Sequence, residues 1–127
     1  MATPRRTLAE RLHSRKIKQP PKLIYCTLGY LWRWVYFKKL NVKVTMHQDP
    51  RDCRGPYIMV SNHASRLDYI FTGAVLLPQT FNFVAGYNEF FRSHLAFIFR
   101  LLQVIPKKNF TPDIYTIKEI ARVLRKG

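Results

Sequence analysis

The chain has 127 residues, of which 47% are hydrophobic and 14% aromatic. This length suits one domain, and the apolar share excludes an intrinsically disordered chain. The net charge is +15, and residues 1–54 hold 13 basic and 3 acidic residues, so we expect an anionic partner, either nucleic acid or an anionic membrane surface. The two cysteines, Cys26 and Cys53, have neither disulfide nor metal-ligand spacing, which indicates a reducing compartment and no metal site.

Residues 1–40 are expected to form a basic N-terminal segment that precedes the main domain. Its first part, residues 1–21, ends in Gln19-Pro20-Pro21. It is interpreted either as chain without fixed structure or as a short amphipathic helix around residues 8–17. It does not resemble a signal peptide, because no apolar core follows within range of a small-residue cleavage site.

The second part of this segment, residues 22–39, reads KLIYCTLGYLWRWVYFKK. Only ten uncharged residues lie between Lys22 and Arg33, whereas a helix that spans a bilayer needs about 20. Tryptophan and tyrosine rings suit the headgroup region, and Lys38 and Lys39 suit anionic lipid. We therefore predict an amphipathic, aromatic helix that lies in the membrane interface. A helix buried in a water-soluble core is the alternative.

Two strands are predicted between residues 41 and 60. Residues 41–47 alternate apolar and polar side chains, which is the pattern of a half-buried strand. A polar loop rich in turn residues, QDPRDCRGP, follows. Residues 57–60, YIMV, form a continuous apolar run, which indicates a strand buried on both faces and paired with the preceding one.

Helices and strands are expected to alternate in the rest of the chain. A helical stretch starts at about Ser65, and its apolar part, residues 69–77, ends before Pro78. Residues 81–85, FNFVA, indicate a second buried strand, and residues 90–102 a strongly apolar helix.

Two details of the later helices follow from single residues. Thr111-Pro112-Asp113 starts the last helix, with Pro112 at its first position, and Gly127 suits the C-cap. His94 is interpreted as a helix-surface residue and not as a second catalytic group.

The clearest candidates for catalytic residues lie in residues 57–68, YIMVSNHASRLD. His63 follows the apolar run there, and Asp68 comes five residues later. A residue at the carboxyl end of a buried strand lies where open α/β sheets bind ligands. A neutral imidazole takes a proton from a hydroxyl near pH 7, and a carboxylate on its other nitrogen fixes the tautomer. No activated serine or cysteine is evident beside them, so we expect direct base catalysis. The alternative is that Ser65 and Asp68 form only a helix capping box.

The pattern Asn62-His63-x-Ser65-x-x-Asp68 resembles the first signature block of the glycerolipid acyltransferases, which include the lysophosphatidate and glycerol-3-phosphate acyltransferases. The resemblance covers most of the chain after residue 40. It implies that His63 is the general base, that Asp68 orients it, and that Asn62 and Ser65 belong to the substrate site. It also implies an acyl donor that is acyl-CoA or acyl-carrier protein, with no other cofactor.

Later parts of the chain carry the same resemblance. Residues 84–89 resemble the family's second block, where a strand leads to a short helix under the active site. The next region of the family carries a glycine, an apolar strand and an arginine that contacts the acceptor's phosphate. Here Leu102 stands at the glycine position, and Lys107 or Lys108 at the basic one. Lysine neutralises a phosphate but lacks arginine's bidentate geometry, and a solvated basic loop is the alternative.

The family continues beyond this point with a strand and a phenylalanine-proline-glutamate-glycine-threonine-arginine block. The sequence therefore resembles the first part of such a domain. The fold class expected is α/β, a mixed sheet flanked by helices over residues 41–127, incomplete at the C-terminus.

The function expected is acyl transfer to the free hydroxyl of a lysophospholipid such as 1-acylglycerol 3-phosphate, in phospholipid biosynthesis. The protein is expected on the cytoplasmic face, as a peripheral or monotopic membrane protein that contacts the lipid surface and not nucleic acid. Two alternatives remain open. One is a non-catalytic membrane-binding fragment of the same fold, and the other is a small basic nucleic-acid-binding protein.

Overall fold

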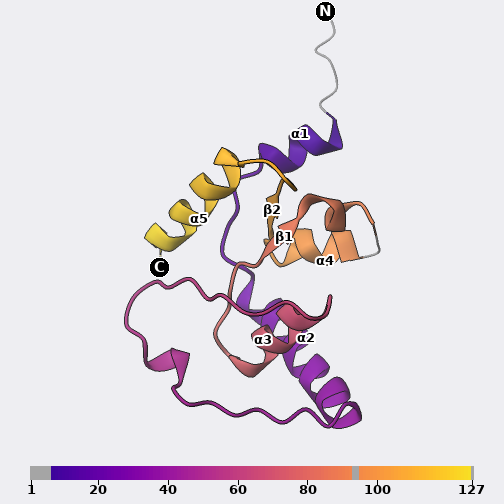
Figure 1. The fold of residues 1–127 in the computed structure, drawn as a ribbon, viewed down its shortest axis with the longest axis vertical. Coiled ribbons are helices and arrows are strands. Elements are labelled where there is room, and N and C mark those ends of the chain that lie inside the picture. The colour runs from indigo at the N-terminus through magenta and orange to yellow at the C-terminus, as the bar shows by residue number, and fades with distance from the viewer. Residues whose placement is uncertain (1–6, 93–94, 127) are drawn as a thin grey trace, which may run out of the picture.

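The computed structural model describes residues 7–92 and 95–126, and helices predominate in it (Figure 1). The elements in chain order are α1 (Leu8–His13), α2 (Lys22–Trp32), a π-helical continuation (Arg33–Phe37), a 3₁₀ turn (Pro50–Asp52), α3 (Asp68–Val75), β1 (Val84–Gly86), a second 3₁₀ turn (Tyr87–Phe90), α4 (Leu95–Leu101), β2 (Ile105–Lys107) and α5 (Ile114–Lys126). Helices combined with a small sheet agree with the expected α/β class. The predictions for His94 and Gly127 fall outside the described residues.

The sheet consists of β1 and β2, which run parallel with Val84 opposite Ile105 and Gly86 opposite Lys107. Parallel neighbours need a crossover connection, and α4 provides it between the two strands (Figure 1). The carboxyl ends of both strands therefore lie at the same edge of the sheet. Strands were expected over 81–85 and in the apolar region before Lys107, and both occur in shorter form.

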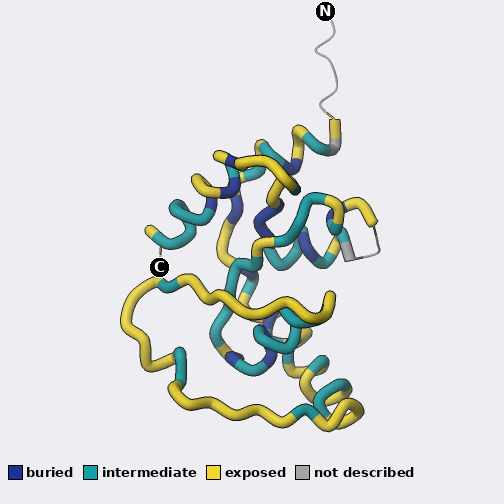
Figure 2. The backbone as a smooth tube through the Cα atoms, viewed as in Figure 1, coloured by how far each residue is buried: buried dark blue, intermediate teal, exposed yellow. Residues whose placement is uncertain are grey.

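The prediction of strands at residues 41–47 and 57–60 is wrong. All of these residues are described, and none of them pairs in a sheet. Ile58 and Val60 are 65% and 89% exposed, and most of this part of the chain lies on the outside (Figure 2). An apolar or alternating pattern describes side chains, but a strand also needs a neighbour for its N–H and C=O groups. The expected mixed sheet is therefore a two-stranded parallel sheet.

Two helices begin later than the sequence indicates. The helical stretch expected from about Ser65 begins at Asp68. Pro112 does not occupy the first helical position, because α5 begins at Ile114. The side chain of Asp113 accepts the N–H of Tyr115 at 3.1 Å and so caps this helix. A carboxylate that satisfies otherwise unpaired N–H groups fixes the helix start better than a proline does.

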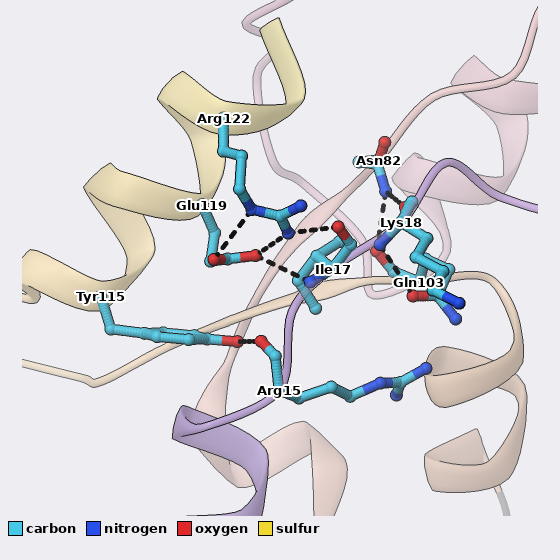
Figure 3. Close-up of polar contacts among 8 residues, drawn as sticks. All are labelled: Arg15, Ile17, Lys18, Asn82, Gln103, Tyr115, Glu119 and Arg122. Carbon is cyan, nitrogen blue, oxygen red and sulfur yellow. Dashed lines mark hydrogen bonds and ion pairs between the residues drawn. The ribbon is translucent and has the colours of Figure 1, made fainter. Parts of the chain in front are cut away.

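The N-terminal residues pack against the domain that follows them. Leu12 belongs to the core cluster with Phe90, Phe99 and Val104. Ile17 is only 1% exposed. Polar contacts hold the segment around Ile17 along α5 (Figure 3). The described part of residues 1–21 is therefore a short helix followed by an extended chain that completes the core.

Backbone groups of this segment bond to side chains of α5. The N–H of Ile17 donates to Glu119 Oε2 at 2.7 Å, and Arg122 donates both to Glu119 and to the carbonyl of Ile17. The hydroxyl of Tyr115 donates to the carbonyl of Arg15 at 2.6 Å (Figure 3). Because the extended segment has no strand neighbour, these side chains take the place of sheet partners.

The side chain of Asp113 makes contacts with three parts of the chain: α1, the loop that follows β2, and α5. Its Oδ2 atom accepts the N–H of Lys108 at 2.9 Å and lies 3.1 Å from His13 Nε2. Burial alone would raise the pKa of Asp113, but hydrogen bonds from Lys108, His13 and Thr116 outweigh burial and hold the pKa well below its usual range. The carboxylate is therefore ionised at neutral pH.

A depressed carboxylate pKa predicts stability that is fully present above the ordinary pKa and is lost progressively as the pH falls from there toward the lower pKa of the folded state. We expect the free energy of unfolding to decrease from about pH 5 to about pH 3, and Asp113→Asn to flatten this dependence. Urea unfolding at several pH values measures it. Asp52→Asn, which removes an exposed carboxylate, is the matched control. An unchanged slope in Asp113→Asn would contradict the assignment.

Candidate active site

The turn between residues 63 and 68 is closed by one carboxylate. Asp68 Oδ2 accepts the N–H groups of Ala64 and Ser65, each at 2.7 Å. The hydroxyl of Ser65 accepts the N–H of Leu67 at 3.3 Å. A short acidic side chain at the first position of α3 is well placed for such bonds. The local sequence thus folds the chain back before the helix begins.

This turn brings His63 to Asp68. The distance from His63 Nδ1 to Asp68 Oδ2 is 3.3 Å, and the two side chains are 73% and 24% exposed. Asp68 therefore closes the turn and faces the imidazole at the same time. The expected helix capping box of Ser65 and Asp68 is not formed, because α3 begins at Asp68 with Leu67 as its N-cap and without a side-chain capping bond. A carboxylate at Nδ1 favours the tautomer that carries its proton there, which leaves Nε2 free to accept a proton.

The pKa of Asp68 is lowered mainly by the hydrogen bond from the N–H of Ser65. Partial burial opposes this shift, while the N–H of Ala64 and the neighbouring His63 add to it. The carboxylate is therefore ionised at neutral pH. An ionised carboxylate is the kind of partner that stabilises an imidazolium beside it.

His63 and Asp68 line a cavity of about 1210 Å³. Its walls come from the extended chain at residues 55–59, from α3, from β1 and from the far end of α5. Apolar side chains line much of it: Met59, Phe83, Phe99, Val104, Ile105 and Leu124. Ligand pockets typically measure about 300–1,000 Å³, so this cavity has room for a substrate with an apolar chain.

The structure separates the predicted site residues into two groups. His63 and Asp68 lie in the cavity, whereas Asn62 and Ser65 are exposed and do not line it. Lys107 and Lys108 do not line it either; both are exposed, at and just after the carboxyl end of β2.

Two arginines that sequence reasoning missed line the same cavity as His63, namely Arg66 and Arg92. Both are exposed. Arg66 lies within the motif, one residue after Ser65, so the sequence could have indicated it as a site residue. No local pattern could have indicated Arg92, because only the fold brings it to the same cavity as His63.

The backbone conformation that favours glycine occurs at Gln103, with φ of 55°, one residue after Leu102. The Gln103 side chain is used there: its Oε1 atom accepts the N–H of Lys18 at 3.0 Å, and its amide donates to the carbonyl of Arg100 at 3.2 Å. A glycine would relieve the backbone but could not hold the N-terminal segment at this point.

Within residues 7–92 and 95–126, no group of three or more His, Cys, Asp and Glu side chains is arranged to hold a metal ion. None of the helices in the described part of the chain is both long and apolar enough to cross a membrane.

Comparison with curated proteins and with solved structures gives no match. A family model described as acyltransferase matches residues 41–127, which is more than half of the chain. The matched range contains His63, Asp68, both arginines and nearly all of the cavity lining. By its sequence, then, the chain belongs to this acyltransferase family.

Proposed function

We propose that the protein transfers a fatty acyl group from acyl-CoA or acyl-carrier protein to the free hydroxyl of a lysophospholipid such as 1-acylglycerol 3-phosphate. In a cell this reaction would serve phospholipid biosynthesis. The observation that carries the proposal is the 3.3 Å His63–Asp68 pair on a cavity with apolar walls. A base beside apolar space suits a reaction between a hydroxyl and a fatty acyl thioester.

The chemistry needs one base and no covalent enzyme intermediate. His63 takes the proton of the acceptor hydroxyl as its oxygen attacks the thioester carbonyl, so that a C–O bond forms. The C–S bond then breaks, and the thiolate leaves and receives the proton from the imidazolium. Asp68 acts as a positioning residue, because it holds the ring and stabilises its charged form.

The phosphate of the acceptor needs positive charge near the base. Arg66 and Arg92 line the cavity that contains His63, and neither has an ion-pair partner among the described residues. Arginine binds phosphate through two parallel hydrogen bonds. We therefore assign the phosphate contact first to these two arginines. Lys107 and Lys108 remain predicted phosphate contacts from outside the cavity.

Acyl transfer from radiolabelled acyl-CoA tests the proposal, with lysophosphatidate and monoacylglycerol compared as acceptors, for residues 1–127 and for the full natural reading frame.

We expect Arg66→Gln and Arg92→Gln to raise KM for lysophosphatidate by about 10-fold each, since a hydrogen bond to a charged group contributes about 1.5–3 kcal/mol. KM for monoacylglycerol should not change. Arg54→Gln, at an exposed arginine outside the cavity, is the control. Equal effects on both acceptors would remove the arginines from phosphate binding.

The proposal places the protein at the cytoplasmic face of a membrane through α2 and its π-helical continuation. Several large apolar side chains there are exposed: Leu23 by 81%, Leu31 by 56% and Trp34 by 66%. Large exposed apolar patches on soluble monomers usually mark an interaction site, such as a membrane contact. A helix on the membrane surface would bring the cavity near lysophospholipids.

A further inference from the structure

The turn that follows α2 contains a groove of about 730 Å³, which we call the α2-end groove. It is separate from the cavity of His63, since the two share no lining residue. The α2-end groove is lined by Tyr30, Arg33, Trp34, Phe37, Lys38, Asn41 and Val42. In Figure 1 residues 30–42, which contribute its lining, lie at the lower right, where the purple helix turns into the long loop. Two cations thus share a groove with three aromatic rings.

Both cations are held over aromatic rings. Arg33 Cζ lies 5.9 Å from the centre of the Phe37 ring, and Lys38 Nζ lies 5.9 Å from the centre of the Trp34 ring. Such cation–π contacts orient a positive group without neutralising its charge. The two side chains therefore lose less conformational entropy when they bind a ligand, because part of their rotational freedom is already lost.

No carboxylate competes for these cations nearby. Residues 11–48 contain nine lysines and arginines and no aspartate or glutamate. The ion pairs of the described residues involve His13, Arg51, His63 and Arg122, and neither Arg33 nor Lys38. The positive charge of the groove is available for an external anion.

Three carbonyl groups at the end of the helix are already hydrogen-bonded. The carbonyls of Tyr36, Phe37 and Lys38 accept the N–H groups of Leu40, Val42 and Asn41, at 2.9, 3.0 and 3.3 Å. Asn41 adopts a left-handed conformation, with φ of 49°, which makes this closure possible. The positive groups Arg33 and Lys38 therefore lie at a closed helix end.

We propose that the α2-end groove binds the phosphate headgroup of an anionic membrane phospholipid. Exposed apolar side chains beside the groove distinguish a lipid from a soluble anion: Leu31, Trp34, Val35 and Leu40. These side chains suit the acyl region of a bilayer while Arg33 and Lys38 reach its headgroups. The inference rests on the membrane contact of α2 proposed above, and it names the lipid class and the residues that select it.

Flotation of the protein with vesicles tests the proposal. One set of vesicles contains phosphatidylcholine alone, and the other contains phosphatidylcholine with one-fifth phosphatidic acid. We expect wild-type protein to bind both and to prefer the anionic set. The double variant Arg33→Gln/Lys38→Gln should lose about 10-fold or more of its affinity for anionic vesicles, with unchanged binding to neutral ones. The matched control, Lys39→Gln/Lys43→Gln, removes the same charge from the same segment but lies outside the groove, and should lose less than about 3-fold.

Each other outcome overturns a defined part of the proposal. Equal losses in the two double variants would show attraction by diffuse charge and no groove. Equal binding of wild-type protein to both vesicle sets would remove the headgroup site but leave the membrane contact. Absence of binding to either set would remove both. Single-stranded RNA that competes with anionic vesicles in a manner dependent on Arg33 and Lys38 would assign the groove to nucleic acid.

Discussion

Replacing His63 with alanine is expected to lower kcat/KM for acyl transfer by about 10²- to 10⁴-fold, which is the usual contribution of a general base. The fold should not change, because the side chain is 73% exposed and its one ion pair within the described part of the chain is with Asp68. Steady-state rates with lysophosphatidate and acyl-CoA measure the effect. Thermal unfolding of the same variant separates lost chemistry from lost structure.

Two companion variants sharpen this test. His47→Ala removes an exposed histidine outside the cavity and should leave turnover unchanged. Asp68→Asn keeps the shape of the side chain but weakens support for the imidazolium, so the acidic limb of the pH–rate profile should shift. A His63→Ala enzyme that keeps more than half of its turnover would remove this residue from the mechanism.

Replacing Ile17 with alanine should lower the free energy of unfolding by about 2–4 kcal/mol, as expected for a buried isoleucine. Ile17 is only 1% exposed, and its backbone is fixed by Glu119 and Arg122. The truncated side chain would leave a cavity that this fixed backbone cannot close. Urea unfolding with an unchanged m-value measures the loss.

Ile117→Ala is the matched control, because the same atoms are removed from a side chain that is 65% exposed on α5. Its effect should stay within about 0.5 kcal/mol. Similar losses in the two variants would mean that the N-terminal segment is not part of the core. The predicted difference would place residues outside the family match of 41–127 inside the folded unit.

Local signals predicted the features that depend on neighbours in sequence. The helices over Lys22–Trp32, Asp68–Val75 and Ile114–Lys126 follow apolar patterns and nearby charges or caps. The contact between His63 and Asp68 also arises within one turn, so the motif alone was sufficient to anticipate it. Two helices begin two or three residues later than predicted, in each case at a position where an aspartate carboxylate accepts backbone N–H groups.

Features that depend on distant partners could not be predicted. Residues 57–60 have the composition of a buried strand, yet no neighbouring strand covers them in the described structure. Ile17 stands between Lys16 and Lys18, a local pattern that does not indicate burial, but Glu119 and Arg122 hold its backbone against α5. Arg92 joins the cavity only through the fold. In each case the missing information is a contact made across a large sequence separation.

The contact between Ile17 and Glu119 also sets the order of events during synthesis. The two residues are 102 positions apart, and translation at 5–20 residues per second needs about 5–20 s to cover that distance. During this time Ile17 has emerged without α5, whose side chains hold its backbone. The nascent chain therefore exposes the apolar side chain of Ile17 until α5 is made.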